Sequence, residues 1–476
     1  MVLRRTPETA DEEAASQGLH IFTGRIIHSK SLTELEIIPQ GAIGVLPDGR
    51  IAFLSREETN ISNLQRKYAR LHLDFTSATI THLKPSQFLF PGLIDCHLHA
   101  PQWPNLALGM DDTLRDWIEK YTDPMEASYS DTEKARRVYS DAVRTTLRLG
   151  STTVAYNTTM HVEATNILTD CVLAAGQRAI MGKMCVTVGS TSGNWESSTE
   201  ESLKGSEACI EYVLSKDSEG RLVRPCVQPR GGPYCPPDLM KGLGEQYAKY
   251  KRVYVQAHMC ETEDDIERTL ALHPPHSTYS DIYLANNLLH PRTILAHGIY
   301  LQPRDIQNIL SAKAGIAHNP NSNTTLRDGH CPVRSLLEAG VKVGLGTDCS
   351  AGYMPSIHAA MRDASNVSRH LAMSRGDAKH VLRFEELVYL ATMGGAAVLD
   401  MQDEIGNFEV GKWFDALVVD VEGVVGVERE LWEWDSSRGD AEALVRKWVF
   451  CGDDRTVRRV FVGGRVVGGW DVGHVS

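Results

Sequence analysis

Short apolar runs recur through the middle of the chain, and several end in a residue that can bind metal or move protons. The runs Val253–Ala257 and Thr293–Ala296 are followed directly by His258 and His297. Apolar runs of this length between helical stretches are typical of buried parallel strands. Because the C-terminal ends of barrel strands meet at one mouth, the pattern predicts a shared site there.

From about residue 91 to 399 the apolar runs alternate with stretches of helical spacing. This alternation predicts an α/β fold with a (β/α)8 TIM barrel. An open doubly wound sheet is the alternative, but the Gly-rich turn of a dinucleotide site is missing. Helices are expected over 131–149, 161–176, 201–215, 236–250, 261–272, 303–313, 332–340, 355–373 and 384–399.

Both ends of the chain have a β pattern instead. In the first 90 residues, the runs Gly41–Leu46 and Ile51–Leu54 flank Asp48-Gly49, which is typical of a tight hairpin turn. Gly463-Gly464 marks a second hairpin near the C-terminus. We therefore expect a barrel over 91–399, inserted into a small β-sandwich domain built from residues 1–90 and 400–476.

Composition narrows the classes of partner. The 476 residues are 42% hydrophobic and 23% charged, with a net charge of −12, so neither nucleic acid nor an anionic membrane is an expected partner. A small-molecule substrate fits better. The ten cysteines form no C-x-x-C pair, and no apolar run is long enough to span a bilayer. A reducing, cytoplasmic location is the simplest prediction.

The strand-end residues suit a metal ion. His97 and His99 are two apart, so both side chains face the same side of a strand. With His258 and Asp348 they form an N/O ligand set typical of Zn²⁺ that leaves room for water; Fe²⁺ is the less favoured alternative. Glu261 follows His258 closely enough to carry protons.

Each of these residues also has a structural interpretation. A lone strand-end histidine is more often a hydrogen-bonded structural residue, and Glu261 is equally typical of a helix N-terminus. Lys183 could indicate a carbamylated lysine that bridges two metals. The shared strand-end position favours a single metal site, and His318 is expected to be structural.

Longer motifs resemble the amidohydrolase superfamily and, within it, its guanine-deaminating branch. The resemblance extends from about residue 20 to 468, with a looser stretch near 189–230. It is carried by the motifs Pro91–His99, Ala100–Asn105, Trp117–Thr122, Ala317–Asn323, Gly344–Asp348 and Glu404–Lys412.

The resemblance implies a homodimeric enzyme with one zinc ion per subunit that converts guanine and water to xanthine and ammonia. Hydroxide would attack C2 of guanine, and Glu261 would protonate N3 and help the amino group leave. The implied metal ligands are His97, His99, His258 and Asp348, and the implied catalytic residues are Glu261, Asp348 and His297. The implied substrate-binding residues are His99, Ala100, Pro101, Gln102, Arg230, Gly231, His258, Glu261 and Asp348.

One position departs from the family pattern, and it leaves the substrate open. The family usually has an aromatic residue where this chain has Gly231, and Tyr234 and Trp103 are the aromatic candidates to replace it. Without the resemblance, Arg230 would be interpreted as a surface salt-bridge residue. The alternatives are a zinc hydrolase of another aminopurine, a pterin or a triazine, and a non-catalytic scaffold. The presence of all four ligands and Glu261 disfavours the scaffold.

Overall fold

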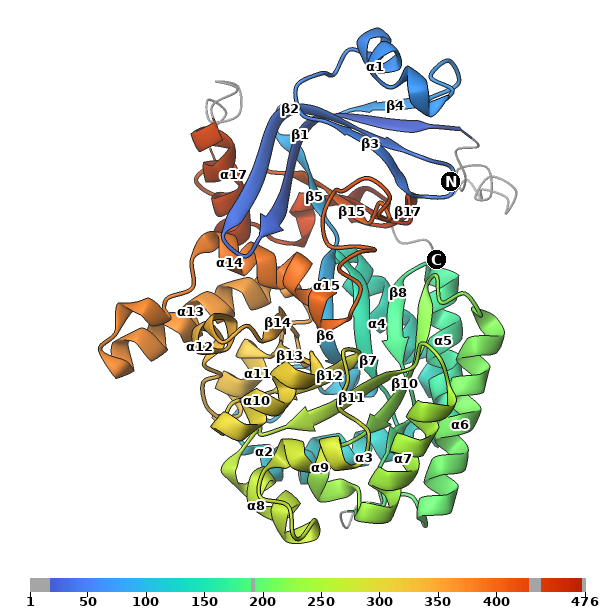
Figure 1. Ribbon diagram of the computed structural model, residues 1–476, viewed down its shortest axis with the longest axis vertical. Coiled ribbons are helices and arrows are strands. Elements are labelled where there is room, and N and C mark those ends of the chain that lie inside the picture. Colours follow the sequence, from blue (N-terminus) through green and yellow to red (C-terminus); the bar gives the residue numbers. More distant parts are fainter. Residues whose placement is uncertain (1–17, 190–192, 428–437, 473–476) are drawn as a thin grey trace, which may run out of the picture. The chain divides into compact units, whose positions relative to one another are not determined.

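The computed structural model describes residues 18–189, 193–427 and 438–472 (Figure 1). The chain divides into two compact units. One is Leu93–Gln402, and the other combines residues up to Gly92 with those from Asp403 onward. We propose these two units as the domains of the protein.

The unit Leu93–Gln402 is built on a ring of eight parallel strands. The ring closes where the Asp348 backbone N–H, just beyond the last strand, donates to the His97 carbonyl at 2.8 Å. The predicted α/β barrel is confirmed. In spatial order its strands are β6 (Leu93–His99), β7 (Ser151–Asn157), β8 (Arg178–Met181), β10 (Val223–Pro229), β11 (Tyr254–Met259), β12 (Thr293–His297), β13 (Gly315–His318) and β14 (Lys342–Leu345), and the short β9 (Met184–Cys185) pairs with β10.

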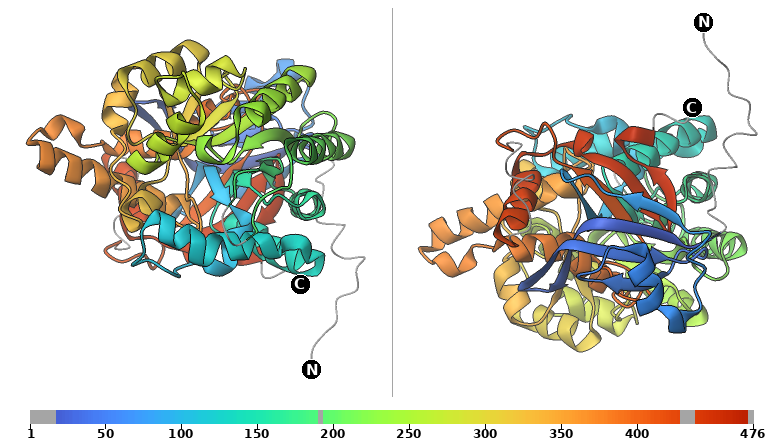
Figure 2. Two further views of the ribbon diagram at one scale, coloured as in Figure 1. Left: turned by 90° about the horizontal axis from the view of Figure 1, so that it is seen from below. Right: turned by 90° about the horizontal axis from the view of Figure 1, so that it is seen from above.

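Helices surround these strands, as the view from below shows most clearly (Figure 2). Local sequence determines where these helices begin and end. The Asp131 side chain caps the helix that begins at Thr132, and Gly176, at φ 73°, ends the helix that begins at Val162. The expected helices are confirmed as α4 (Thr132–Arg148), α5 (Val162–Ala175), α6 (Thr199–Lys216), α7 (Pro237–Lys249), α8 (Glu263–Leu272), α10 (Pro303–Ala312), α12 (Val333–Glu338) and α13 (Ile357–Arg375), followed by α14 (Phe384–Tyr389) and α15 (Gly395–Val398) with a π-helical stretch between them.

One helix begins later than the sequence predicts. Thr262 is the N-cap of α8, since its side chain accepts from the Asp265 backbone N–H. Glu261 therefore lies in the loop between β11 and α8, after Cys260 with its left-handed φ of 52°. This loop turns Glu261 back towards the strand ends.

Several short helices were not predicted, because each is too short to show helical periodicity. The segment 114–127 contains α2 (Leu114–Trp117), a π-helical turn and α3 (Asp123–Ala127). Two others are α9 (Tyr279–Ala285) and α11 (Pro320–Thr325). The longer α17 (Arg438–Cys451) interrupts the C-terminal region, where only strands were expected.

Both ends of the chain contribute strands to the second unit, as predicted, and these strands form one connected mixed sheet. Phe22, Phe414 and Phe461 pack against one another in its core. Both predicted hairpins are present. The strands follow the order β17 (Arg465–Gly468), β16 (Val457–Val462), β15 (Ala416–Asp420), β5 (Gln87–Pro91), β1 (His20–Ser31), β2 (Glu34–Val45) and β3 (Ile51–Ser55), and β4 (Thr79–His82) pairs with β1.

Candidate active site

Four predicted metal ligands meet at the C-terminal ends of the barrel strands. One ligand atom from each of His97, His99, His258 and Asp348 lies within 4.8 Å of the other three. His99 Nε2 is 3.1 Å from His258 Nε2 and 3.4 Å from Asp348 Oδ1. Another 3.2 Å separates His97 Nε2 from the same carboxylate oxygen. The cluster thus joins two histidines of the first barrel strand, β6, to Asp348, which follows the last strand, β14, at the point where the ring closes.

The protonation pattern of these side chains fits a divalent metal. His258 Nδ1–H donates to the Arg230 carbonyl at 2.6 Å, which leaves the Nε2 lone pair directed at the cluster. Burial lowers the pKa of both His99 and His258 well below its usual value, so both rings are neutral. The two Nε2 atoms, 3.1 Å apart, are close enough to bind one ion together.

Glu261 and His297 adjoin this cluster. His297 Nε2 lies 3.3 Å from Glu261 Oε1 and 3.8 Å from Asp348 Oδ2. The other ring nitrogen of His297 donates to Asn323 Oδ1 at 2.9 Å, which fixes the ring. Burial, and then the nearby Asp348 and Asp265 carboxylates, raise the pKa of Glu261 well above its usual value. A carboxyl with a raised pKa beside the cluster is suited to exchange protons with water or a substrate.

A cavity of about 1130 Å³ opens over the cluster. Ala100 and Pro101 do not line it: both are buried, and the Pro101 carbonyl accepts from the Tyr129 hydroxyl at 2.7 Å. We therefore propose no direct contact between these two residues and the substrate. The other predicted substrate-binding residues do line the cavity, namely His99, Gln102, Arg230, Gly231, His258, Glu261 and Asp348.

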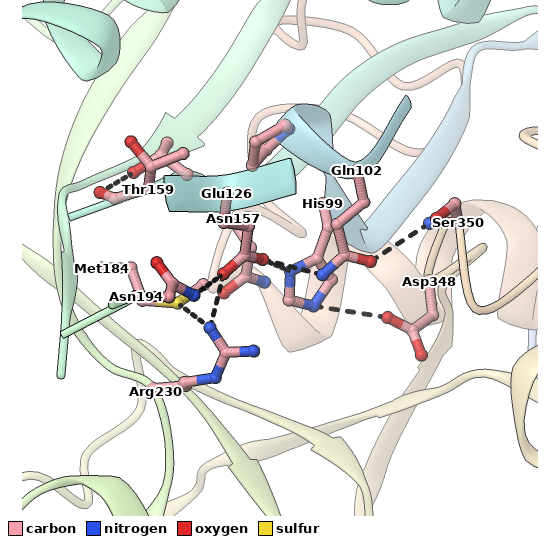
Figure 3. Close-up of polar contacts among 12 residues, drawn as sticks. His99, Gln102, Glu126, Asn157, Thr159, Met184, Asn194, Arg230, Asp348 and Ser350 are labelled. Atoms are coloured by element: carbon pink, nitrogen blue, oxygen red, sulfur yellow. Dashed lines mark hydrogen bonds and ion pairs between the residues drawn. The ribbon is translucent and has the colours of Figure 1, made fainter. Parts of the chain in front are cut away.

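Gln102 and Arg230 are joined through a residue that the sequence did not single out (Figure 3). Glu126 of α3 accepts from Gln102 Nε2 at 2.9 Å and from an Arg230 guanidinium N–H at 2.5 Å. Asn194 Nδ2 donates to the same carboxylate at 2.8 Å and to Asp123 at 3.0 Å. Arg230 is thus a buried, paired cation that faces the cavity, and the surface salt-bridge interpretation is wrong.

Gly231 leaves its part of the cavity wall open. Its backbone is extended, and a Cβ there would meet its nearest neighbour, the Tyr279 hydroxyl, at 3.4 Å. Of the two aromatic candidates, Tyr234 lines the cavity and lies under the Arg230 guanidinium at 5.2 Å. Trp103 does not line it and instead donates to Asp141 at 2.9 Å. Trp195, 44% exposed, adds a second aromatic wall that the sequence did not reveal.

Two residues considered from sequence lie outside the cluster. Lys183 is fully buried, and its ammonium group donates to Glu196 at 2.6 Å, so its charge is already paired. His318 is buried, and it belongs neither to the four-residue cluster nor to the cavity lining.

The sequence missed the acidic partners of the cavity. Asp123 directly follows the motif Trp117–Thr122 and Glu126 lies three residues further on, and a buried arginine needs such partners. The need of a buried arginine for carboxylate partners was the only signal that could have pointed to Asp123 and Glu126. Asp328 gave none; it lines the cavity, and burial, with the charge of Glu261 next, raises its pKa to about 9.

Known proteins resemble this chain along most of its length. The amidohydrolase family profile matches residues 88–467. A probable guanine deaminase of Schizosaccharomyces pombe is 41% identical, covering 95% of this chain and 84% of its own. The guanine deaminase of Homo sapiens is 36% identical, covering 94% and 96%.

Solved structures give the same result. A guanine deaminase from C. acetobutylicum, crystallised with guanine in its active site, superposes with a TM-score of 0.83 at 29% identity. The match covers 94% of this chain and 99% of that one. With the barrel and the strand-end cluster, these likenesses show that the chain belongs to the amidohydrolase family, among the guanine deaminases.

Proposed function

We propose that the protein hydrolyses guanine to xanthine and ammonia. The observation that carries this proposal is the juxtaposition, in one cavity, of the four-residue cluster, the Glu261 carboxyl and the Gln102–Arg230 wall. In this arrangement the four-residue cluster activates water and Glu261 moves protons. Gln102 and Arg230 offer hydrogen bonds to a polar ring. Full-length similarity to guanine deaminases supports the choice of substrate.

The cluster fits one zinc ion, with His97, His99, His258 and Asp348 as its ligands. Bound zinc would lower the pKa of water towards about 7 and so supply hydroxide at neutral pH. Three imidazoles and one carboxylate are the ligand types that zinc prefers, and Fe²⁺ is the alternative that these ligands also permit.

The chain's own groups complete the hydrolysis. Burial alone would raise the pKa of Asp348, but the neighbouring His97 and other histidines hold it low, so this carboxylate is ionised. Its position in the four-residue cluster suits it to take a proton from water. Glu261 delivers a proton to ring N3 as the water oxygen bonds to C2. Glu261 then takes up the proton that remains on the added oxygen and passes it to the amino group, so that the C2–N bond breaks, the C2=O bond forms and ammonia leaves. The proton held by Asp348 passes to Glu261, which restores both carboxyl groups for the next cycle.

A panel of substrates tests the proposal. Metal-replete protein is incubated separately with guanine, 2,6-diaminopurine, a 2-aminopterin and an amino-substituted triazine, and ammonia release is measured. We expect the highest kcat/KM for guanine, with xanthine formed in equal amount to ammonia. Deamination of another ring while guanine is untouched would contradict the substrate, and no reaction with any ring would contradict the enzyme itself.

Two further expectations are part of the proposal. We propose a homodimer, on the family resemblance, which sedimentation velocity would test against a monomer of 52.7 kDa.

We also propose a cytoplasmic site of action. All ten cysteines are free, nine of them buried, as a reducing compartment permits. Among the described residues, no helix has the length and apolarity to cross a bilayer.

A further inference from the structure

Glu126 is a buried carboxylate that both recognition side chains share. It lies on α3, is fully buried, and has both of its oxygens occupied. Oε1 accepts from Gln102 and lies 3.9 Å from His99 Nδ1, while Oε2 accepts from Arg230 and Asn194 (Figure 3). Glu126 itself does not line the cavity, so its influence on a substrate passes through these neighbours.

The first consequence concerns the orientation of the Gln102 amide. Its Nε2 donates to Glu126 at 2.9 Å, and its Oε1 accepts from the Ser350 backbone N–H at 3.5 Å. A carboxylate only accepts, so it holds the NH₂ end of the amide on its own side. One N–H and one oxygen lone pair of Gln102 therefore stay in fixed directions for a ligand.

The second consequence concerns the charge of Arg230. Its guanidinium lies 2.5 Å from Glu126 and 3.7 Å from Asp123, so one cation is paired with two carboxylates. Burial alone would lower the pKa of Arg230, but these carboxylates raise it overall. The charge-assisted bond to Glu126 holds the guanidinium in place where Arg230 lines the cavity.

We infer that Glu126 is a positioning residue that fixes the hydrogen-bond pattern of Gln102 and Arg230 and thereby sets selectivity among aminopurines. This inference rests on the proposed function. A wall held in one arrangement penalises a ring that lacks the matching polar group, because buried donors then stay unpaired. If the Gln102 amide can flip, it can present either its N–H or its oxygen to the ring, and part of the cost of an unpaired donor is avoided.

The test uses Glu126→Gln, which keeps the shape but replaces one accepting oxygen by a donor that faces other donors. We expect kcat/KM for guanine to fall at least about tenfold, and the preference for guanine over 2,6-diaminopurine to narrow. Glu133→Gln, the same change at an exposed carboxylate on α4, is the matched control and should leave both values unchanged.

A double-mutant cycle separates positioning from mere support of the fold. In a Gln102→Ala background, Glu126→Gln should cost clearly less than in the wild type, since one of the groups it positions is gone. Additive losses with an unchanged substrate preference would overturn the inference. Asn194→Ala, which removes one donor to Glu126 and keeps its charge, should shift selectivity the same way and serves if Glu126→Gln does not fold.

The wild-type protein, measured in the same assay, distinguishes a failure of the proposed function from a failure of the inference about Glu126. If it does not deaminate guanine, the proposed function fails. If it does, and the variants at 126 and 194 fold but keep the wild-type preference, only the role of Glu126 fails.

Discussion

At the scale of single residues, the side chain of Glu261 carries the proton chemistry of the account. It is buried beside His297 and Asp348, and its pKa is raised. We expect Glu261→Gln to lower kcat by about 100-fold to 10,000-fold, because an amide cannot relay protons. Ammonia release measures the loss. Bound metal should stay at the wild-type level, and a fully active variant would rule out the proposed role.

Gly231, which lines the cavity, and the adjacent Gly232 give a second residue-scale prediction. A Cβ at Gly231 meets only ordinary contacts, whereas a Cβ at Gly232 would lie 2.2 Å from Cγ2 of the buried Thr269. Gly231→Ala should therefore fold with an unchanged melting temperature. Gly232→Ala should lose about 1–3 kcal/mol of stability through overpacking. Equal melting temperatures for the two variants would contradict this reading of the wall.

The site residues that were predicted from the sequence and those that were missed differ in what determines their position in the fold. His97 and His258 lie near the C-terminal ends of apolar strands and Asp348 lies just beyond one, so the convergence of strand ends in a barrel predicts that they meet. Glu126 is brought to Arg230 across 104 residues by an irregular segment with no periodicity. No local rule predicts such a pair.

At the scale of elements, periodicity predicted the barrel helices because each buries one face against the strands. It failed for α2 and α3, which are single turns joined by a π-helical stretch, and for α17, which interrupts a region of strands. The start of α8 was predicted two residues early, because the Thr262 cap outweighs the helical tendency of Glu261.

The β1–β2 pair yields an element-scale prediction on pH. Glu36 of β2 accepts from the buried His28 of β1 at 2.9 Å and from Arg56 at 2.9 Å. The His28 hydrogen bond, and then Arg56, lower the pKa of Glu36 from 4.5 to about 2 against the opposing effect of burial.

A lowered pKa means that the unfolded state binds more protons, so this stabilisation is present above pH 4.5 and is lost as the pH falls towards about 2. In urea unfolding, wild-type protein should exceed Glu36→Gln in stability at pH 6, and the gap should narrow as the pH is lowered. Glu34→Gln, at an exposed carboxylate on the same strand, is the control. A gap that stays constant with pH would contradict the assignment.

At the scale of the whole molecule, the strand–helix alternation was enough to predict a barrel, and the β patterns at both ends were enough to predict one terminal β unit. All residues lining the cavity belong to the unit Leu93–Gln402. The shape and lining of the cavity were not predictable, because loops after different strands build it and their conformations depend on contacts across the barrel mouth.

The central claim is that one metal ion in the four-residue cluster makes the protein a guanine deaminase. The most direct measurement removes the metal with a chelator and titrates zinc back while following xanthine formation from guanine. We predict that activity is lost on removal and returns linearly until one zinc per chain is bound, whereas His258→Ala regains almost none. Full activity in metal-free protein, or a wild-type rate in His258→Ala, would contradict the account.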